Sequence, residues 1–190
     1  MKEQVRLFIA IEVSEQQKHE LTELQHKLKG DLEGVRWVRL EGLHLTLKFF
    51  GEIEEEKIGL IVKAMDYSMA SLTAFQIIYG GCGVFPSPQK ARVIWTGLAE
   101  GASDVQKLAE KLEYNLSGYN FAREKRAYHP HLTLGRLRYP LSENVINKII
   151  EQERTFKTAA ADINGAILYK SQLFRQGAVY TPIHKATFKN

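Results

Sequence analysis

The tetrapeptide His-Leu-Thr-Leu occurs twice in this chain of 190 residues, at His44–Leu47 and at His131–Leu134. In an extended strand, side chains two residues apart point to the same face of the sheet. Each copy therefore presents His and Thr on one face and two leucines on the other, which is typical of a strand that covers a core on one side only. Two matched copies arise by chance on the order of once in 10⁵ shuffled sequences of this composition, so we interpret them as a duplication.

The segments around the two copies repeat one order of elements. In each half the pattern predicts a strand, a helix, two strands, a helix and a closing strand, with helix N-caps at Ser14 and Ser142 and a helix end at Gly30. The expected ranges are 5–13, 14–29, 35–39, 43–50, 54–71 and 74–79 in the first half, and 91–98, 102–117, 121–127, 131–137, 141–153 and 166–173 in the second, followed by a hairpin strand over 178–183.

The spacing between corresponding positions predicts the overall architecture. Ile9 lies 35 residues before His44, and Ile94 lies 37 residues before His131, so we expect lobes related by pseudo-twofold symmetry. The predicted fold class is α+β, with antiparallel sheets lining a central groove and helices outside. One domain over residues 1–190 is expected, with lobes at about 1–85 and 86–190 and with C-terminal strands able to cross between them. The stretch 80–88, with three glycines and two prolines, is the expected connector.

Charge and composition narrow the choice of ligand and compartment. A net charge of +4 and a pI near 9.1 suit an anionic ligand such as RNA or a nucleotide, although a basic surface without a partner has the same charge. The sequence has no apolar segment long enough for a membrane span and no secretion signal, so we expect a cytoplasmic monomer with no membrane partner. The single cysteine, Cys82, excludes an intramolecular disulfide and a cysteine-cluster metal site.

The two motifs together suit chemistry at a phosphate. If pseudo-symmetry brings the strands to one groove, the hydroxyls of Thr46 and Thr133 can donate hydrogen bonds to non-bridging phosphate oxygens. Of the two imidazoles, one can accept a proton from water while the other protonates the leaving oxygen. His44 and His131 are therefore the candidate acid–base pair, since an unperturbed histidine titrates near neutral pH.

Two other functions stay open at this point. His129 and His131 form a His-x-His pair on one face, which predicts a metal-dependent hydrolase if carboxylates come from elsewhere, because no Asp or Glu occurs over residues 125–141. A protein that binds RNA or nucleotides without turning them over would also keep both motifs.

Longer segments resemble a known superfamily. The resemblance is to the 2H phosphoesterases and covers essentially the whole chain. It lies in the segments RLFIAIEV, VRWV followed by HLTLKFFGE, GVFPSPQKARVIWTGL, PHLTLGR and LYKSQLFRQGAVYTPI. Within this superfamily the match is to the bacterial and archaeal RNA 2′,3′-cyclic phosphodiesterases once described as 2′-5′ RNA ligases. The resemblance implies hydrolysis of a 2′,3′-cyclic phosphate at RNA or nucleotide ends to a 2′-phosphate, with reversible 2′-5′ ligation as a variant and with no metal or organic cofactor.

The same resemblance implies roles for individual residues. His44 and His131 would be catalytic, one activating water and the other protonating the departing 3′ oxygen, and Thr46 and Thr133 would bind the phosphate. The sequence does not decide which histidine has which role; our interpretation takes His44 as the proton donor and His131 as the proton acceptor. Arg136 matches an arginine placed near the phosphate in this family. Simple alternation puts Arg136 on the leucine side of its strand, so this role requires a bulge or a strand end near it.

Several other residues are weaker candidates. Lys48 shares the His44 face by alternation and would add positive charge for the substrate, while Tyr128 would stack on a base. Three further aromatic residues are expected in the core rather than at a base: Trp37, Phe49 and Trp95.

Overall fold

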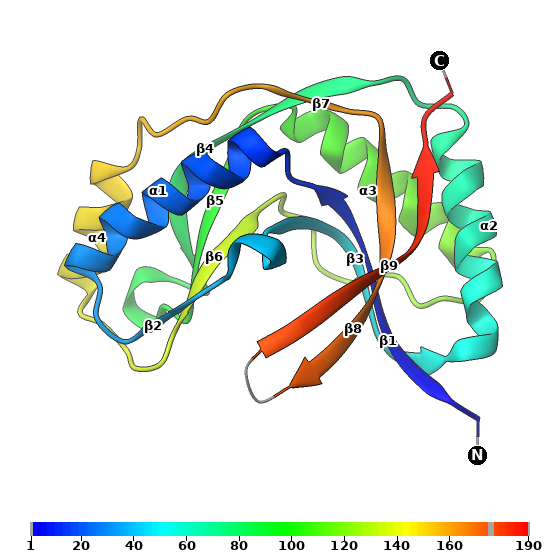
Figure 1. Ribbon diagram of the computed structural model, residues 1–190, viewed down its shortest axis with the longest axis horizontal. Helices are drawn as coiled ribbons and strands as arrows, with labels where there is room; N and C mark the ends of the chain where they lie inside the picture. Colours follow the sequence, from blue (N-terminus) through cyan, green and yellow to red (C-terminus); the bar gives the residue numbers. More distant parts are fainter. Residues whose placement is uncertain (1, 175–176, 190) are drawn as a thin grey trace.

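The computed structural model describes residues 2–174 and 177–189 and has the expected α+β architecture, with helices packed against two antiparallel sheets (Figure 1). The helices of this part are α1 (Glu15–Asp31), α2 (Ile58–Met69), α3 (Ala102–Ser117) and α4 (Glu143–Gln152). The strands are β1 (Gln4–Glu12), β2 (Val35–Trp37), β3 (His44–Glu54), β4 (Phe75–Phe85), β5 (Val93–Glu100), β6 (Leu132–Leu137), β7 (Ala161–Ile163), β8 (Gly165–Phe174) and β9 (Gly177–Thr187).

Strands are exchanged between the two halves of the chain. One sheet has the order β3-β1-β8-β9 and the other has the order β2-β6-β5-β4-β7. The C-terminal strands β8 and β9 thus pair with the N-terminal sheet, while β2 and β4 pair with strands of the second half. Sheet membership therefore does not follow the sequence division expected near residue 85, because each half completes the sheet of the other.

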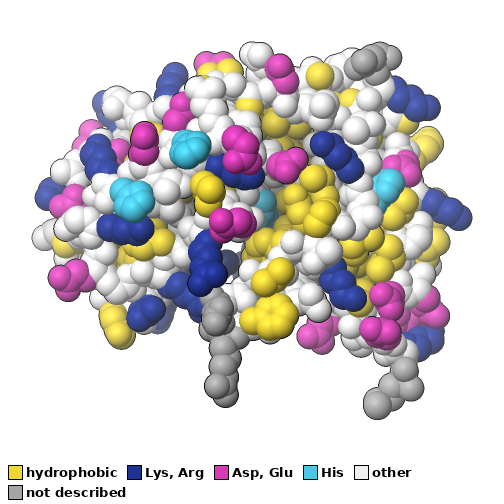
Figure 2. All heavy atoms as spheres, in the orientation of Figure 1, with side chains coloured by type: hydrophobic (Ala, Val, Ile, Leu, Met, Phe, Trp, Pro, Cys, Tyr) yellow, Lys and Arg dark blue, Asp and Glu magenta, His cyan; other side chains and the backbone are white. Residues whose placement is uncertain are grey.

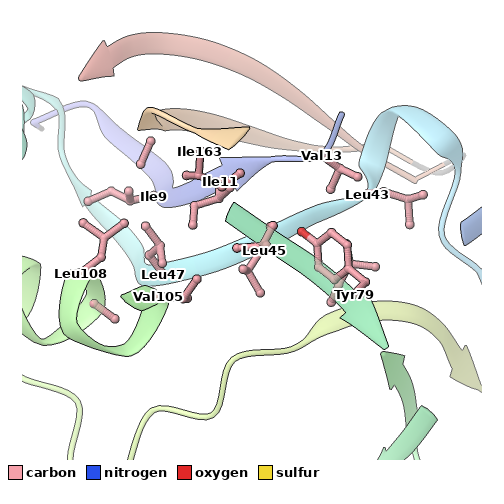
Figure 3. Close-up of a cluster of buried hydrophobic side chains, with 14 of the residues drawn as sticks. Ile9, Ile11, Val13, Leu43, Leu45, Leu47, Tyr79, Val105, Leu108 and Ile163 are labelled. Carbon is pink, nitrogen blue, oxygen red and sulfur yellow. The ribbon is translucent and has the colours of Figure 1, made fainter. Parts of the chain in front are cut away.

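The helices cross between the sheets as well. Helix α1 follows β1 but packs behind the second sheet, where the side-chain amide of Gln17 donates to the carbonyl of Ile77 on β4. Helix α3 follows β5 but packs behind β3, beside α2. Figure 3 shows Leu45 and Leu47 of β3 facing Val105 and Leu108 of α3. The leucines of the first motif therefore lie in the core, as alternation predicts.

In the described part of the chain, no helix combines the length and the apolar character needed to cross a lipid bilayer.

The predicted N-caps at Ser14 and Ser142 are confirmed, whereas the helix expected from residue 54 begins at Ile58 and one predicted helix end is wrong. The hydroxyl of Ser14 accepts from the backbone N–H of Gln17 at 3.2 Å, and Ser142 caps α4 in the same way. Gly30 does not end α1, which continues to Asp31. Gly30 is not among the glycines with positive φ, so it adopts no left-handed cap and the helix passes through it.

The predicted connector is also largely a strand. Residues 80–85 belong to β4 and pair with β5, so the turn between the halves is shorter than expected. Gly83 lies directly beneath the indole of Trp95: a Cβ on Gly83 would lie 2.2 Å from a ring carbon. The glycine here leaves room for an aromatic ring inside a sheet, which sequence reasoning mistook for a turn signal. The segment expected to be extended over 121–127 forms no strand.

Two glycine substitutions test this account of the fold. Gly83→Ala is expected to lower the free energy of unfolding by about 1–3 kcal/mol, because the added methyl group collides with Trp95. Gly30→Ala has nothing within 4 Å of the new Cβ and is expected to raise it by about 0.5–1 kcal/mol, since alanine favours a helix. Urea unfolding measures both. A Gly83→Ala protein as stable as wild type would contradict the placement of Trp95.

Candidate active site

A β-bulge lies just after the first histidine motif. On β1 and β3, Ala10 pairs with Thr46 and the next residue back, Ile9, pairs with Lys48. Leu47 is therefore an extra residue without a partner, which is the definition of a bulge. Beyond such a residue the alternation of side chains between the two faces is reversed, so a simple period of two fails after Leu47.

The second motif contains the same bulge at the same place. On β5 and β6, Trp95 pairs with Thr133 and Ile94 pairs with Gly135, leaving Leu134 as the extra residue. Ile9 and Ile94, the positions used to align the halves, thus pair with the fourth residue after each histidine. The duplication extends to backbone irregularity, which supports the pseudo-twofold relation.

This second bulge turns Arg136 toward the site. Arg136 is exposed whereas the following Leu137 is buried, and the positive charge of Arg136 acts on His131. The carbonyl of the bulged Leu134 accepts from the side-chain amide of Gln25 on α1 at 2.8 Å and also from a backbone N–H of the chain after β2. The bulge that the placement of Arg136 requires is therefore present, and α1 holds it.

Two of the three core assignments, Phe49 and Trp95, are wrong. Phe49 follows the first bulge and is 50% exposed, with the guanidinium of Arg6 lying 4.7 Å from the centre of its ring. Trp95 lies beside His131, with their ring centres 6.3 Å apart, rather than in the core. Trp37 is half-buried against the core, as expected.

Both histidines are oriented by the same backbone contact. Nδ1 of His44 lies 2.7 Å from the carbonyl oxygen of Gly42, and Nδ1 of His131 lies 2.7 Å from that of His129. A carbonyl can only accept a hydrogen bond, so Nδ1 carries the hydrogen in both rings. Nε2 of each neutral imidazole is therefore left with a lone pair for proton transfer.

Aromatic side chains from distant parts of the chain surround each ring. The centre of the His44 ring lies 4.7 Å from that of Phe8 on β1 and 5.1 Å from that of Tyr180 on β9. The His131 ring lies 4.8 Å from Phe85, the last residue of β4. Sequence reasoning missed these residues. Alternation along β1 could have placed Phe8 on the His44 side, but Tyr180 reaches His44 only because the strands are exchanged.

Burial is the largest influence on both imidazoles, and it lowers the pKa of each below the usual 6.5. The hydrogen bond to the backbone carbonyl opposes this effect in both. The pKa of His131 is lowered further by the charges of His129 and Arg136. His44 instead lies directly opposite Glu12 across β1 and β3. The two histidines thus share a geometry, but positive neighbouring charge lowers the pKa of His131 and not that of His44.

Lys48 does not share the face of His44, so that expectation is wrong. Its side chain is buried, and its ammonium lies 2.6 Å from a carboxylate oxygen of Glu113 on α3 while donating to the carbonyl of Ala122 at 2.8 Å. The bulge at Leu47 is the reason, because it turns the next residue toward the core side of β3.

Tyr128 is not placed as a platform for a base. Its ring packs against the core, and its hydroxyl donates to the backbone carbonyl of Thr46 at 2.7 Å. Together with Lys48, it ties the segment between α3 and β6 to β3. Strands β3 and β6 are in contact where the two sheets meet (Figure 1). These contacts bring the two His-x-Thr motifs together, with the half-buried Thr46 and Thr133 beside their histidines.

His129 is exposed next to His131 and supplies the carbonyl that orients it. Among residues 2–174 and 177–189, no group of three or more His, Cys, Asp or Glu side chains is close enough together to hold a metal ion.

Two sheets that each present a bulged His-x-Thr strand, with matched imidazoles, define a two-histidine phosphoesterase. Comparison with known families narrows this class. The family described as LigT like phosphoesterase matches residues 11–95 and 97–180, one segment around each motif, and the chain belongs to this family.

Curated relatives and solved structures agree with this assignment. The chain is 32% identical to the RNA 2′,3′-cyclic phosphodiesterase of Methanothermobacter thermautotrophicus, covering 93% of this chain and 95% of the relative. It is 32% identical to that of Thermotoga maritima, covering 97% and 96%. A crystal structure of a Thermus thermophilus protein superimposes with a TM-score of 0.79 at 26% identity, covering 96% of this chain and 97% of that one. Escherichia coli LigT complexed with 3′-AMP shares the fold, with a TM-score of 0.76 at 22% identity and coverage of 99% and 100%.

Replacing Lys48 separates a structural role from substrate binding. Lys48→Met is expected to lower the free energy of unfolding by about 1–3 kcal/mol, since it leaves the carboxylate of Glu113 without its ammonium partner. The double variant Lys48→Met/Glu113→Leu is expected to recover most of this loss. Denaturant unfolding of wild type, both single variants and the double variant gives the coupling energy. A Lys48→Met protein of wild-type stability with a raised KM would instead place Lys48 on the substrate.

Proposed function

We propose that this chain hydrolyses 2′,3′-cyclic phosphates at RNA or nucleotide ends and leaves a 2′-phosphate. The observation that carries the proposal is the matched pair of imidazoles: each Nδ1 is held by a carbonyl two residues earlier, and each Nε2 remains for proton transfer. The names of the relatives that span almost the whole chain support the choice of substrate.

The proposed reaction needs only these side chains and water. Nε2 of His131 takes a proton from water while the water oxygen bonds to phosphorus. The bond from phosphorus to the 3′ oxygen breaks, and that oxygen takes the proton from Nε2 of the His44 imidazolium. Thr46 and Thr133 donate hydrogen bonds to the non-bridging oxygens, and Arg136 stabilises their charge. Solvent then returns the proton to His44 and removes the one on His131.

Neighbouring charge supports this assignment of the two roles. The base must be neutral before reaction, and the positive charges of His129 and Arg136 disfavour the imidazolium form of His131. The acid must be protonated, and the influences that act on the pKa of His44, burial and the hydrogen bond to Gly42, include no positive charge from the described residues. Because every step is reversible, the same pair would also join a cyclic phosphate to a 5′ hydroxyl as a 2′-5′ link.

The first test measures turnover of a nucleoside 2′,3′-cyclic phosphate and of an oligoribonucleotide with the same end, both in EDTA. His44→Ala and His131→Ala are each expected to lower kcat/KM by at least about 10²-fold, because each removes one proton-transfer group. His26→Ala, which changes an exposed histidine on α1, serves as the control and is expected to match wild type. Wild type that is inert in EDTA but active with added metal would favour a metal site at His129 and His131. Binding without turnover under any condition would leave a nucleotide-binding protein.

The pH profile tests the electrostatics of the pair. Since burial lowers both pKa values, both limbs of the profile of kcat/KM against pH are expected below 6.5. In the profile of kcat against pH, the negative charge of the bound phosphate favours the imidazolium forms of both histidines. Both limbs of that profile are therefore expected at higher pH than in kcat/KM. Arg136→Gln removes a positive charge that lowers the pKa of His131 and is expected to move the acid limb of kcat/KM to higher pH. An acid limb that does not move would argue against His131 as the base.

A further inference from the structure

Two arginines lie directly opposite each other beside the site. Arg36 of β2 pairs with Arg136 of β6, and both side chains are exposed. Opposed residues of an antiparallel pair project from the same face, with Cβ atoms about 4.5–5.5 Å apart, and like charges in this position are destabilising. Neither arginine forms a salt bridge with an acidic residue of the described part of the chain. Two uncompensated guanidinium groups on one face are typical of an anion site.

This face is the one that carries the second histidine motif. The bulge at Leu134 returns Arg136 to the side of Thr133, and the opposed Arg36 projects from the same side. Strand β2 lies one strand beyond β6, a step of about 4.8 Å. A path from His131 along β6 to β2 therefore meets Arg136 first and Arg36 next. Figure 2 shows Lys and Arg side chains gathered over β2 and the adjoining part of β6.

The hairpin of β8 and β9 spans the distance from His44 to Arg36. Tyr180 of this hairpin packs on His44, while a guanidinium nitrogen of Arg36 lies 3.9 Å from the position that a Cβ on Gly177 would take. Figure 1 shows the hairpin extending from the first sheet toward β2 of the second. Arg36 thus lies where the hairpin of one sheet reaches the edge strand of the other.

We propose that Arg36, acting with Arg136, binds the phosphodiester on the 5′ side of the terminal nucleotide of an RNA chain. The proposal rests on the proposed function, in which the cyclic phosphate lies at the two histidines and threonines. Arg136 adjoins that phosphate, and Arg36, one strand further away, is placed for the next one. A guanidinium group suits this role because its planar donors bind two phosphate oxygens together. The protein would then prefer RNA ends to nucleoside 2′,3′-cyclic phosphates.

The test compares three substrates with the same terminal base. They are adenosine 2′,3′-cyclic phosphate, the same nucleotide with a 5′-phosphate, and the dinucleotide ApA with a 2′,3′-cyclic phosphate end. Arg36→Gln is expected to lower kcat/KM about tenfold, mainly through KM, on the two substrates with a second phosphate, and to leave the first within about twofold. Arg36→Lys is expected to fall between Arg36→Gln and wild type on these two.

A matched arginine controls for net charge. Arg154 is exposed beyond the end of α4, where it pairs with Glu151, and Arg154→Gln is expected to behave as wild type on all three substrates. The salt dependence gives a second readout. The slope of log kcat/KM against log salt concentration on the dinucleotide is expected to become shallower by about 0.7 in Arg36→Gln, the value for one lost contact to a single strand.

Equal losses on all three substrates would overturn the proposal, because Arg36 would then act on the reacting phosphate or on the fold. An Arg36→Gln protein that matches wild type on the dinucleotide would overturn it as well. If wild type turns over none of the substrates, the proposed function fails instead. The affinities of wild type and Arg36→Gln for adenosine 2′-phosphate and for ApA ending in a 2′-phosphate then test the phosphodiester site. Weaker binding by Arg36→Gln of the dinucleotide alone supports the site. Equal binding of the dinucleotide by both proteins overturns it.

Discussion

The one-residue bulge that follows each histidine motif determines which side chains reach the site. Without the extra residue at Leu134, Arg136 would lie on the core side of β6, and without its counterpart at Leu47, Lys48 would lie on the same face of β3 as His44. The carbonyl of the bulged Leu134 accepts hydrogen bonds from the backbone N–H of Val38 and from the side-chain amide of Gln25 on α1. Helix α1, behind the sheet, thus stabilises a bulge that turns Arg136 to the opposite face of the sheet. The same device on both strands gives each histidine an equivalent backbone setting.

Because strands and helices are exchanged between the two halves, residues from distant parts of the chain contribute to the site. The ring of His44 packs against Phe8 from the N-terminal strand and Tyr180 from the C-terminal hairpin. The segment leading to His131 is tied to β3 through the hydroxyl of Tyr128 and the ammonium of Lys48. Since the buried side chains of both sheets form one continuous cluster, neither half has a complete core of its own. The relative placement of the two motifs therefore depends on the packing that stabilises the fold.

A symmetric scaffold carries an asymmetric distribution of charge. The two imidazoles have the same hydrogen bond at Nδ1 and burial lowers the pKa of each, yet the positive charge of Arg136 acts on His131 and no positive charge of the described residues acts on His44. Acid and base in one reaction must begin in different protonation states, and two identical environments would not favour this. Under the proposed function, charged residues outside the repeated motif would let two equivalent histidines take different roles.

The sequence by itself determined the features that depend on neighbours along the chain. Alternation within His-Leu-Thr-Leu placed the leucines in the core and the histidines on the other face, helix caps marked the starts of α1 and α4, and repetition indicated the duplication. Only the tertiary structure decided where Lys48, Phe49 and Trp95 lie, and it alone brought Tyr180 to His44 and Arg36 to Arg136. The physical reason is that a bulge or a strand partner is chosen by hydrogen bonding to another strand, and no local period of two or of 3.6 residues records that choice.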